Sequence, residues 1–168
     1  MNSELKHEID QTMSTFKELA AGFSEKNFNQ VPFEGSWTAG QVGQHMIMSN
    51  SGFVDIIQGP AKETTRKPDD LVTRIKSDFL NFDIKMESPE SVRPQLKSYE
   101  KKQILDSLDE VRANLNKTIS SHDLTKTCTA FELPGYGYLT RLEAANFVLY
   151  HTMRHIHQLK KIREKVTG

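Results

Sequence analysis

The stretch Thr140–Lys165, "TRLEAANFVLYHTMRHIHQLKKIREK", combines a helix start, an apolar stripe and three of the six histidines in the chain. Thr140 with Glu143 three residues later is the pattern of a capping box, in which the two side chains bond each other's backbone N–H groups at a helix N-terminus. Apolar residues then recur at steps of three and four, which is the spacing of one helix face. The stretch therefore predicts a long helix from Thr140 to about Lys165.

Three more long helices are predicted upstream. The first covers residues 3–22, where apolar residues again alternate at steps of four and three: Leu5, Ile9, Met13, Phe16, Leu19 and Phe23. The second begins at the capping-box pair Thr38 and Gln41 and ends at the Gly-Pro pair of residues 59–60. The third runs from about Ser98 to Ile119 through a stripe of Ile104, Leu108, Val111 and Leu115.

Two long connections separate these helices. Residues 59–97 contain "PDDLVTRIKSDFLNF" (68–82), which predicts a short helix, and residues 121–139 contain a Pro-Gly-Tyr-Gly turn after the brief extended piece "CTAFEL" (128–133). The fold class expected is all-α: a four-helix bundle with a long crossover between helices 2 and 3, forming one domain over residues 1–168. Bundles of this kind hold ligands between facing helices.

Composition excludes several classes of protein. The chain has 22 basic and 22 acidic residues and no basic stripe, so nucleic acid is not an expected partner. Its longest apolar run is too short for a membrane span, and its charged start does not resemble a signal peptide. The one cysteine, Cys128, rules out an internal disulfide and suits a reducing compartment. We expect a cytoplasmic protein without membrane association.

The histidines of the last predicted helix are the main candidate for chemistry. His151 and His155 are four residues apart and share a helix face, whereas His157 is turned about 200° from His155. His45 lies inside the second predicted helix. Three imidazoles from two facing helices would leave a metal ion with an open position, as catalytic metal sites do. Spacing alone does not distinguish such a site from packed histidines, because it cannot place His45 opposite the pair.

The other polar residues near these helices are interpreted mainly as structural. Gln158 lies one turn beyond His155 and is read as an ordinary helix residue, and no carboxylate stands out as a general base. Trp37 is expected to anchor the core. Tyr136 and Tyr138 could wall a pocket. The remaining histidines are expected to be solvated: His7, His122 and His157.

Two segments resemble a known family. They are "SWTAGQVGQHMIMSN" (36–50), with a tryptophan at the helix start and a histidine within the helix, and "YHTMRHIHQLKKI" (150–162), with its His-x-x-x-His pair. Together with the approach "LPGYGYLTRLEAANF" (133–147), they resemble the DinB-like superfamily, in its DinB/YfiT-type branch of proposed metalloenzymes. The resemblance implies a four-helix bundle in which His45, His151 and His155 bind a divalent metal ion, with zinc or nickel expected first.

The resemblance also implies a function. It suggests a metal-dependent enzyme, foremost a low-molecular-weight-thiol S-transferase that joins a thiol cofactor to a small electrophile. Two alternatives stay open: a hydrolase that acts through metal-bound hydroxide, and a non-catalytic helical binding or stress-response module. A homodimer is expected, because "DDLVTRIKSDFLNF" (69–82) offers a second amphipathic surface.

Overall fold

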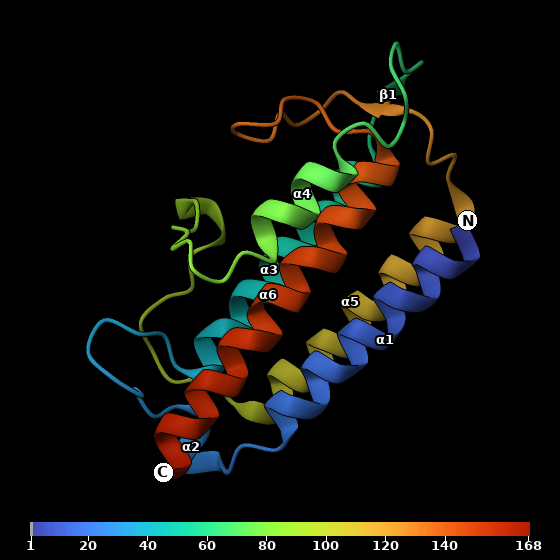
Figure 1. The fold of residues 1–168 in the computed structure, drawn as a ribbon. Helices are drawn as coiled ribbons and strands as arrows, with labels where there is room; N and C mark the ends of the chain where they lie inside the picture. The colour runs from blue at the N-terminus through green and yellow to red at the C-terminus, as the bar shows by residue number, and fades with distance from the viewer. Residues whose placement is uncertain (1) are drawn as a thin grey trace.

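In the computed structural model, which describes residues 2–168, four long helices lie side by side (Figure 1): α1 (Asn2–Ala21), α3 (Ala39–Gln58), α5 (Lys101–Ser121) and α6 (Arg141–Thr167). The shorter elements are α2 (Glu25–Phe28), α4 (Val72–Phe79), the 3-10 turn η1 (Glu90–Val92) and the antiparallel strands β1 (Ala61–Lys62) and β2 (Thr127–Cys128). The predicted all-α four-helix bundle is confirmed. No helix within residues 2–168 is long and apolar enough to cross a membrane.

The crossover from residue 59 to residue 97 decides how the helices pair. It carries the chain back along the length of the bundle, so that α3 and α5 run in the same direction (Figure 1). As a result α1 and α3 each pack against both α5 and α6, and α4 covers α6 from outside. The predicted crossover between the second and third long helices is confirmed, and it contains the predicted short helix.

Local sequence signals place the ends of the helices. Thr38 Oγ1 accepts from the Gln41 N–H at 3.1 Å, and Thr140 Oγ1 accepts from the Glu143 N–H at 3.0 Å, so both capping boxes are present. The helix expected from Ser98 begins at Lys101 instead. The reason is Tyr99, whose backbone N–H and carbonyl bond the Asn29 side chain at 2.8 and 2.9 Å and hold the preceding residues out of the helix.

The buried apolar side chains form two clusters along the bundle. One cluster includes Phe53 and Phe147, and the other includes Phe28, Met46 and Leu159. At the border of the two clusters, α3 and α6 carry a group of buried polar side chains: His45, Ser49, Asn50, His151, Thr152 and His155. A buried polar group is costly unless it is bonded, so this polar layer is the natural place to look for a site.

Gly43 permits the close approach of α3 and α5 next to this layer. A Cβ at position 43 would lie 2.7 Å from Ile104 Cγ2 of α5, whereas a Cβ at Gly52 on the same helix would meet nothing within 4 Å. We expect Gly43→Ala to lower the free energy of unfolding by about 1–3 kcal/mol through overpacking. Gly52→Ala should instead raise it by up to about 1 kcal/mol through helix propensity. Urea denaturation measures both, and equal stability of the two variants would contradict this packing.

Candidate metal centre

The structure brings His45, His151 and His155 together inside the bundle. His45 comes from α3 and the other two from successive turns of α6, and all three are buried. Their Nε2 atoms face one another: His151 Nε2 lies 3.3 Å from His45 Nε2 and 3.0 Å from His155 Nε2. One ring nitrogen from each residue lies within 4.8 Å of the other two.

Hydrogen bonds at the other ring nitrogen orient two of the three imidazoles. His45 Nδ1 donates to the Val92 carbonyl at 2.6 Å, and His155 Nδ1 donates to Gln158 Oε1 at 2.7 Å. Because these acceptors place the proton on Nδ1, each neutral ring turns an Nε2 lone pair toward the centre of the cluster. His151 Nδ1 lies 3.5 Å from the Ser49 hydroxyl, which can donate or accept, so this ring can adopt either tautomer.

This donor set fits a divalent metal ion. Two nitrogens bound tetrahedrally at the zinc–nitrogen distance of about 2.0–2.1 Å would stand roughly 3.3 Å apart, close to the separations found here. A proton on His151 Nε2 can satisfy only one neighbouring lone pair well, whereas a cation satisfies all three. Imidazole nitrogen also suits zinc, nickel, copper and iron alike, so the residues fit a class of ions rather than one element.

Burial keeps these imidazoles neutral. Desolvation lowers the pKa of His45 and, together with His155 and His45, lowers that of His151 far below its usual range. Desolvation, followed by the charge of His45, lowers the pKa of His155 to about 3. A histidine must be neutral to bind a metal ion, so protons compete weakly for this site at neutral pH.

A cleft of about 730 Å³ opens beside the cluster and reaches His155 and Gln158. Its walls are α6 and two loops, residues 33–37 and 82–88, and Trp37 packs on the His45 ring with centroids 5.2 Å apart. Its volume is in the usual range for small-molecule sites. A smaller groove of about 460 Å³ between α3 and α5 contains none of the three histidines.

The structure revises the interpretation of several single residues. Gln158, read from the sequence as an ordinary helix residue, bonds His155, and His157 is half-buried and stacked on Phe82 rather than solvated. Tyr136 bonds Asp78 and packs against the core, so it does not wall this cleft. Val92 could not be found from the sequence because it contributes a backbone carbonyl. Ser49 could have been found from the sequence, because it lies four residues after His45 and therefore on the same face of the helix.

A family model described as the DinB superfamily matches residues 8–159. The chain belongs to the DinB superfamily. This DinB-superfamily chain is also 26% identical over 159 residues to the uncharacterized protein YuaE of Bacillus subtilis (strain 168). The matched region covers 92% of the chain and 93% of YuaE.

Two solved structures share the fold of this DinB-superfamily chain. One is TT2238, described as a four-helix bundle protein, with a TM-score of 0.62 at 16% identity over 96% of the chain and 99% of TT2238. The other is YfiT of Bacillus subtilis, described as a probable metal-dependent hydrolase with an unusual four-helix bundle topology. Its TM-score is 0.64 at 11% identity over 99% of the chain and 87% of YfiT. At these identities the likeness supports the fold.

Gln158 should matter for metal affinity. In Gln158→Leu the proton on His155 Nδ1 loses its acceptor, so the ring is no longer held with Nε2 toward the cluster. We expect metal affinity to fall about 10–100-fold, as for other outer hydrogen bonds to ligating histidines. Competition with a chromophoric chelator measures this. Gln103→Leu, on the exposed surface of α5, is the matched control, and equal affinities of the two variants would contradict the role.

The metal-free protein should lose stability on acidification. Because the pKa of His155 is lower in the folded chain than in the unfolded chain, unfolding takes up protons below the ordinary histidine pKa of about 6.5. The free energy of unfolding should therefore fall as the pH drops from neutrality toward the folded-state value of about 3. Urea denaturation with a chelator at several pH values measures this slope. His155→Gln should show a shallower slope, and an unchanged slope would contradict the shift.

Proposed function

We propose that this chain is a metal-dependent enzyme whose divalent ion is held by the Nε2 atoms of His45, His151 and His155. The observation that carries the proposal is the convergence of three neutral imidazoles, two of them held by acceptors at Nδ1. A protein scaffold gains nothing from facing nitrogen lone pairs, because an apolar core of the same shape would avoid the cost of burying them. The cleft beside His155 supplies room for a small-molecule substrate.

Thiol S-transfer is the chemistry that this donor set favours. Three neutral ligands leave the full charge of the ion at the site, and an ion of this kind lowers the pKa of a water or thiol that binds it. Within residues 2–168, no hydrogen bond or ion pair joins a carboxylate to any of the three histidines. A coordinated thiol needs no such base, because coordination itself deprotonates it. The thiolate sulfur would then bond an electrophilic carbon, whose leaving group departs with the electron pair.

Hydrolysis is the second candidate, with water in place of the thiol. The similarity to YfiT, described as a probable metal-dependent hydrolase, favours it. Both reactions use the same three histidines and the same cleft. They differ in the product, which is a thioether in one case and an acid in the other.

The test begins with protein purified without a histidine tag or nickel column. Elemental analysis should find a stoichiometric divalent metal. The loaded protein is then assayed for thioether formation from 2-mercaptoethanol and 1-chloro-2,4-dinitrobenzene, and for hydrolysis of 4-nitrophenyl acetate. Loss of metal and of whichever activity is found should follow His45→Ala.

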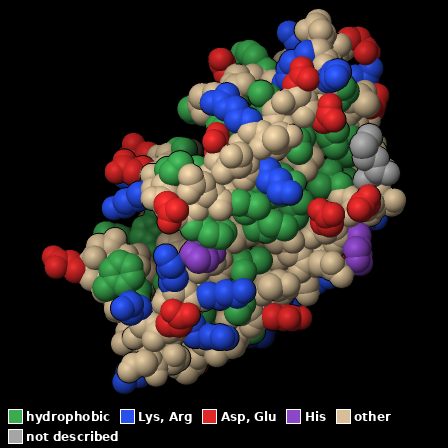
Figure 2. Space-filling view, viewed as in Figure 1, with side chains coloured by type: hydrophobic (Ala, Val, Ile, Leu, Met, Phe, Trp, Pro, Cys, Tyr) green, Lys and Arg blue, Asp and Glu red, His purple; other side chains and the backbone are tan. Residues whose placement is uncertain are grey.

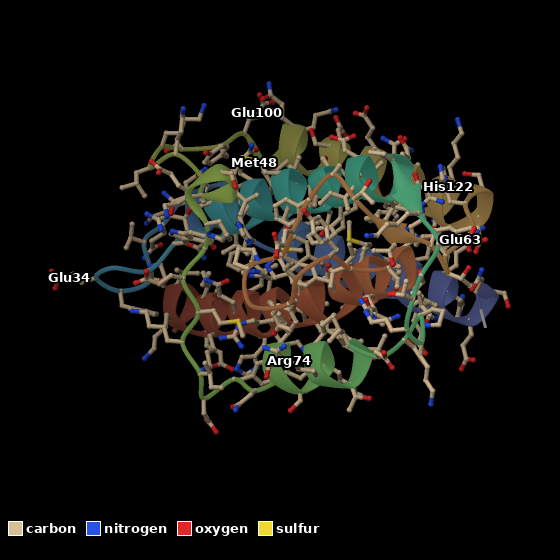
Figure 3. All side chains as sticks on the ribbon, turned by 90° about the horizontal axis from the view of Figure 1, so that it is seen from above. Glu34, Met48, Glu63, Arg74, Glu100 and His122 are labelled. Carbon is tan, nitrogen blue, oxygen red and sulfur yellow. The ribbon has the colours of Figure 1, made fainter. Side chains whose placement is uncertain are left out.

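His122→Ala is the control, since His122 lies at the far end of the bundle, beside Glu63 in Figure 3. It should keep both the metal and the activity. If His45→Ala retains the wild-type metal content, the three histidines are not the site. If metal binds but neither product forms with these or related substrates, the non-catalytic binding module becomes the better description.

A further inference from the structure

The cleft beside the three histidines is lined by cations that have no acidic partner. Four basic side chains contribute to its walls, and within residues 2–168 none of them forms an ion pair: Lys85, Arg93, Arg154 and Lys161. Figure 2 shows Lys and Arg side chains gathered beside a histidine over the C-terminal half of α6. Unpaired charges in a concave site attract ligands of the opposite sign.

Arg154 is half-buried, whereas the other three cations of the cleft are exposed. Its guanidinium donates to the carbonyls of Phe79, at 3.3 Å, and Asn81, at 3.0 Å, and also to that of Ile84. Carbonyl partners fix the group in position without neutralising it. Its positive charge reaches the cluster, since it contributes to the lowered pKa of His151 and of His155.

The acidic residues of the cleft lie on its solvent side. Glu34, Asp83 and Glu87 are exposed residues of the two loops, where water and salt screen their charge. Figure 3 shows Glu34 at the tip of its loop, pointing away from the bundle. Lys85, Arg93 and Lys161 are exposed as well, so the half-buried Arg154 is the least screened charge of the cleft, and a bound divalent ion would add to it.

Apolar side chains line the mouth of the same cleft. The Phe82 ring stacks on His157 with centroids 4.0 Å apart and an interplanar angle of 4°. Phe82 is 42% exposed and Phe33, on the facing loop, is 55% exposed. Large apolar side chains exposed at the rim of a cleft are a common mark of ligand contact. They suit the apolar portion of a molecule whose charged group lies deeper.

We propose that the ligand that reaches the three histidines through this cleft is a small organic anion, with a carboxylate held near Arg154 and Lys161 and an apolar portion against Phe33 and Phe82. The proposal rests on the proposed function, because it assumes that the ligand also binds a metal ion held by the histidines. It adds the substrate class, which the histidines alone do not specify.

The test uses cobalt(II)-loaded full-length protein and three thiols in which two methylene groups link the sulfur to the polar group. They are 3-mercaptopropionate, 2-mercaptoethanol and cysteamine. The probe is the cobalt–thiolate absorption band, which reports binding without any activity. After correction for the thiolate fraction of each compound, the anionic thiol should bind about tenfold more tightly than the cationic one at low ionic strength. The ratio should shrink as salt is added.

Two variants locate the effect. Lys161→Ala should reduce the preference for 3-mercaptopropionate several-fold, whereas Lys160→Ala, the adjacent lysine outside the cleft, should leave it unchanged.

Thiosalicylate, an aromatic anionic thiol, should bind more tightly than 3-mercaptopropionate, and Phe82→Ala should remove that advantage. Equal affinity for the three thiols, or a preference for cysteamine, would overturn the proposed anion while leaving the metal site intact. If no thiol produces the band, thiol binding at the metal is wrong and the anion proposal fails with it.

Discussion

Replacing His151 by alanine is expected to abolish the stabilisation that a divalent metal ion gives the wild-type chain. A ligand that binds only the folded state adds about 4 kcal/mol to the free energy of unfolding when its free concentration is 1,000 times Kd. For a chain of this length that corresponds to a rise in Tm of about 8–16 °C. His151 is central to the cluster, with Nε2 contacts at 3.3 and 3.0 Å to the other two histidines.

The measurement is a series of thermal melts at increasing free zinc or nickel for wild type and variant. Each protein serves as its own reference, so a lower Tm of the metal-free variant does not affect the comparison. His122→Ala, which leaves the three-histidine cluster unchanged, should show the full metal-dependent rise. A rise in His151→Ala equal to that of wild type would exclude this residue as a ligand.

Among the substitutions considered, Glu143→Ala is expected to lower the free energy of unfolding of the metal-free protein the most. The carboxylate is fully buried and accepts four hydrogen bonds: from Arg66 Nη1 at 2.5 Å and Nη2 at 2.7 Å, and from the N–H groups of Leu71 and Thr140, both at 2.9 Å. Its removal leaves the Arg66 charge and two backbone donors without their partner. Breaking a buried pair from one side costs about 3–5 kcal/mol, and the half-exposed setting of Arg66 favours the lower part of that range.

Chemical denaturation of the metal-free protein measures this loss. Glu63→Ala is the matched control, because Glu63 also pairs with a cation, Lys126, but is 85% exposed. An exposed pair contributes about 0–1 kcal/mol, so this variant should stay close to wild type. If the two substitutions cost the same, Glu143 does not anchor the crossover to α6.

The bundle could be predicted because its signals are local. Both threonine caps bond the residue three positions later, and the apolar stripes need only the helical repeat, so each helix is specified within its own segment. The start of α5 was misplaced for the opposite reason. Tyr99 is held by Asn29, 70 residues earlier in the chain, and no helical periodicity reports a contact of that kind.

The candidate site could be predicted only at the level of residue type. The i,i+4 spacing indicated that His151 and His155 share a face. His45 was a candidate third ligand from its place in the second predicted helix, but only the family resemblance assigned it to the same site. The orientation of the rings depends on the backbone carbonyl of Val92 and on the side-chain amide of Gln158. The sequence reveals neither, because every residue has a carbonyl and a glutamine in a helix does not show which partner it bonds. Thiol transfer, a homodimer, a cytoplasmic location and a single domain over residues 1–168 stay predictions.

The bond from His45 to the Val92 carbonyl has a consequence for comparing relatives of this protein. The tautomer of a histidine in the bundle is selected by η1, a turn of the crossover outside the four long helices. Loops tolerate insertions and deletions far better than the helices they connect. A relative could therefore keep all three histidines in an alignment and still bind metal differently, because a change of length near residue 92 moves the acceptor. The length of the crossover near residue 92 is then a feature to compare among relatives together with the three histidines.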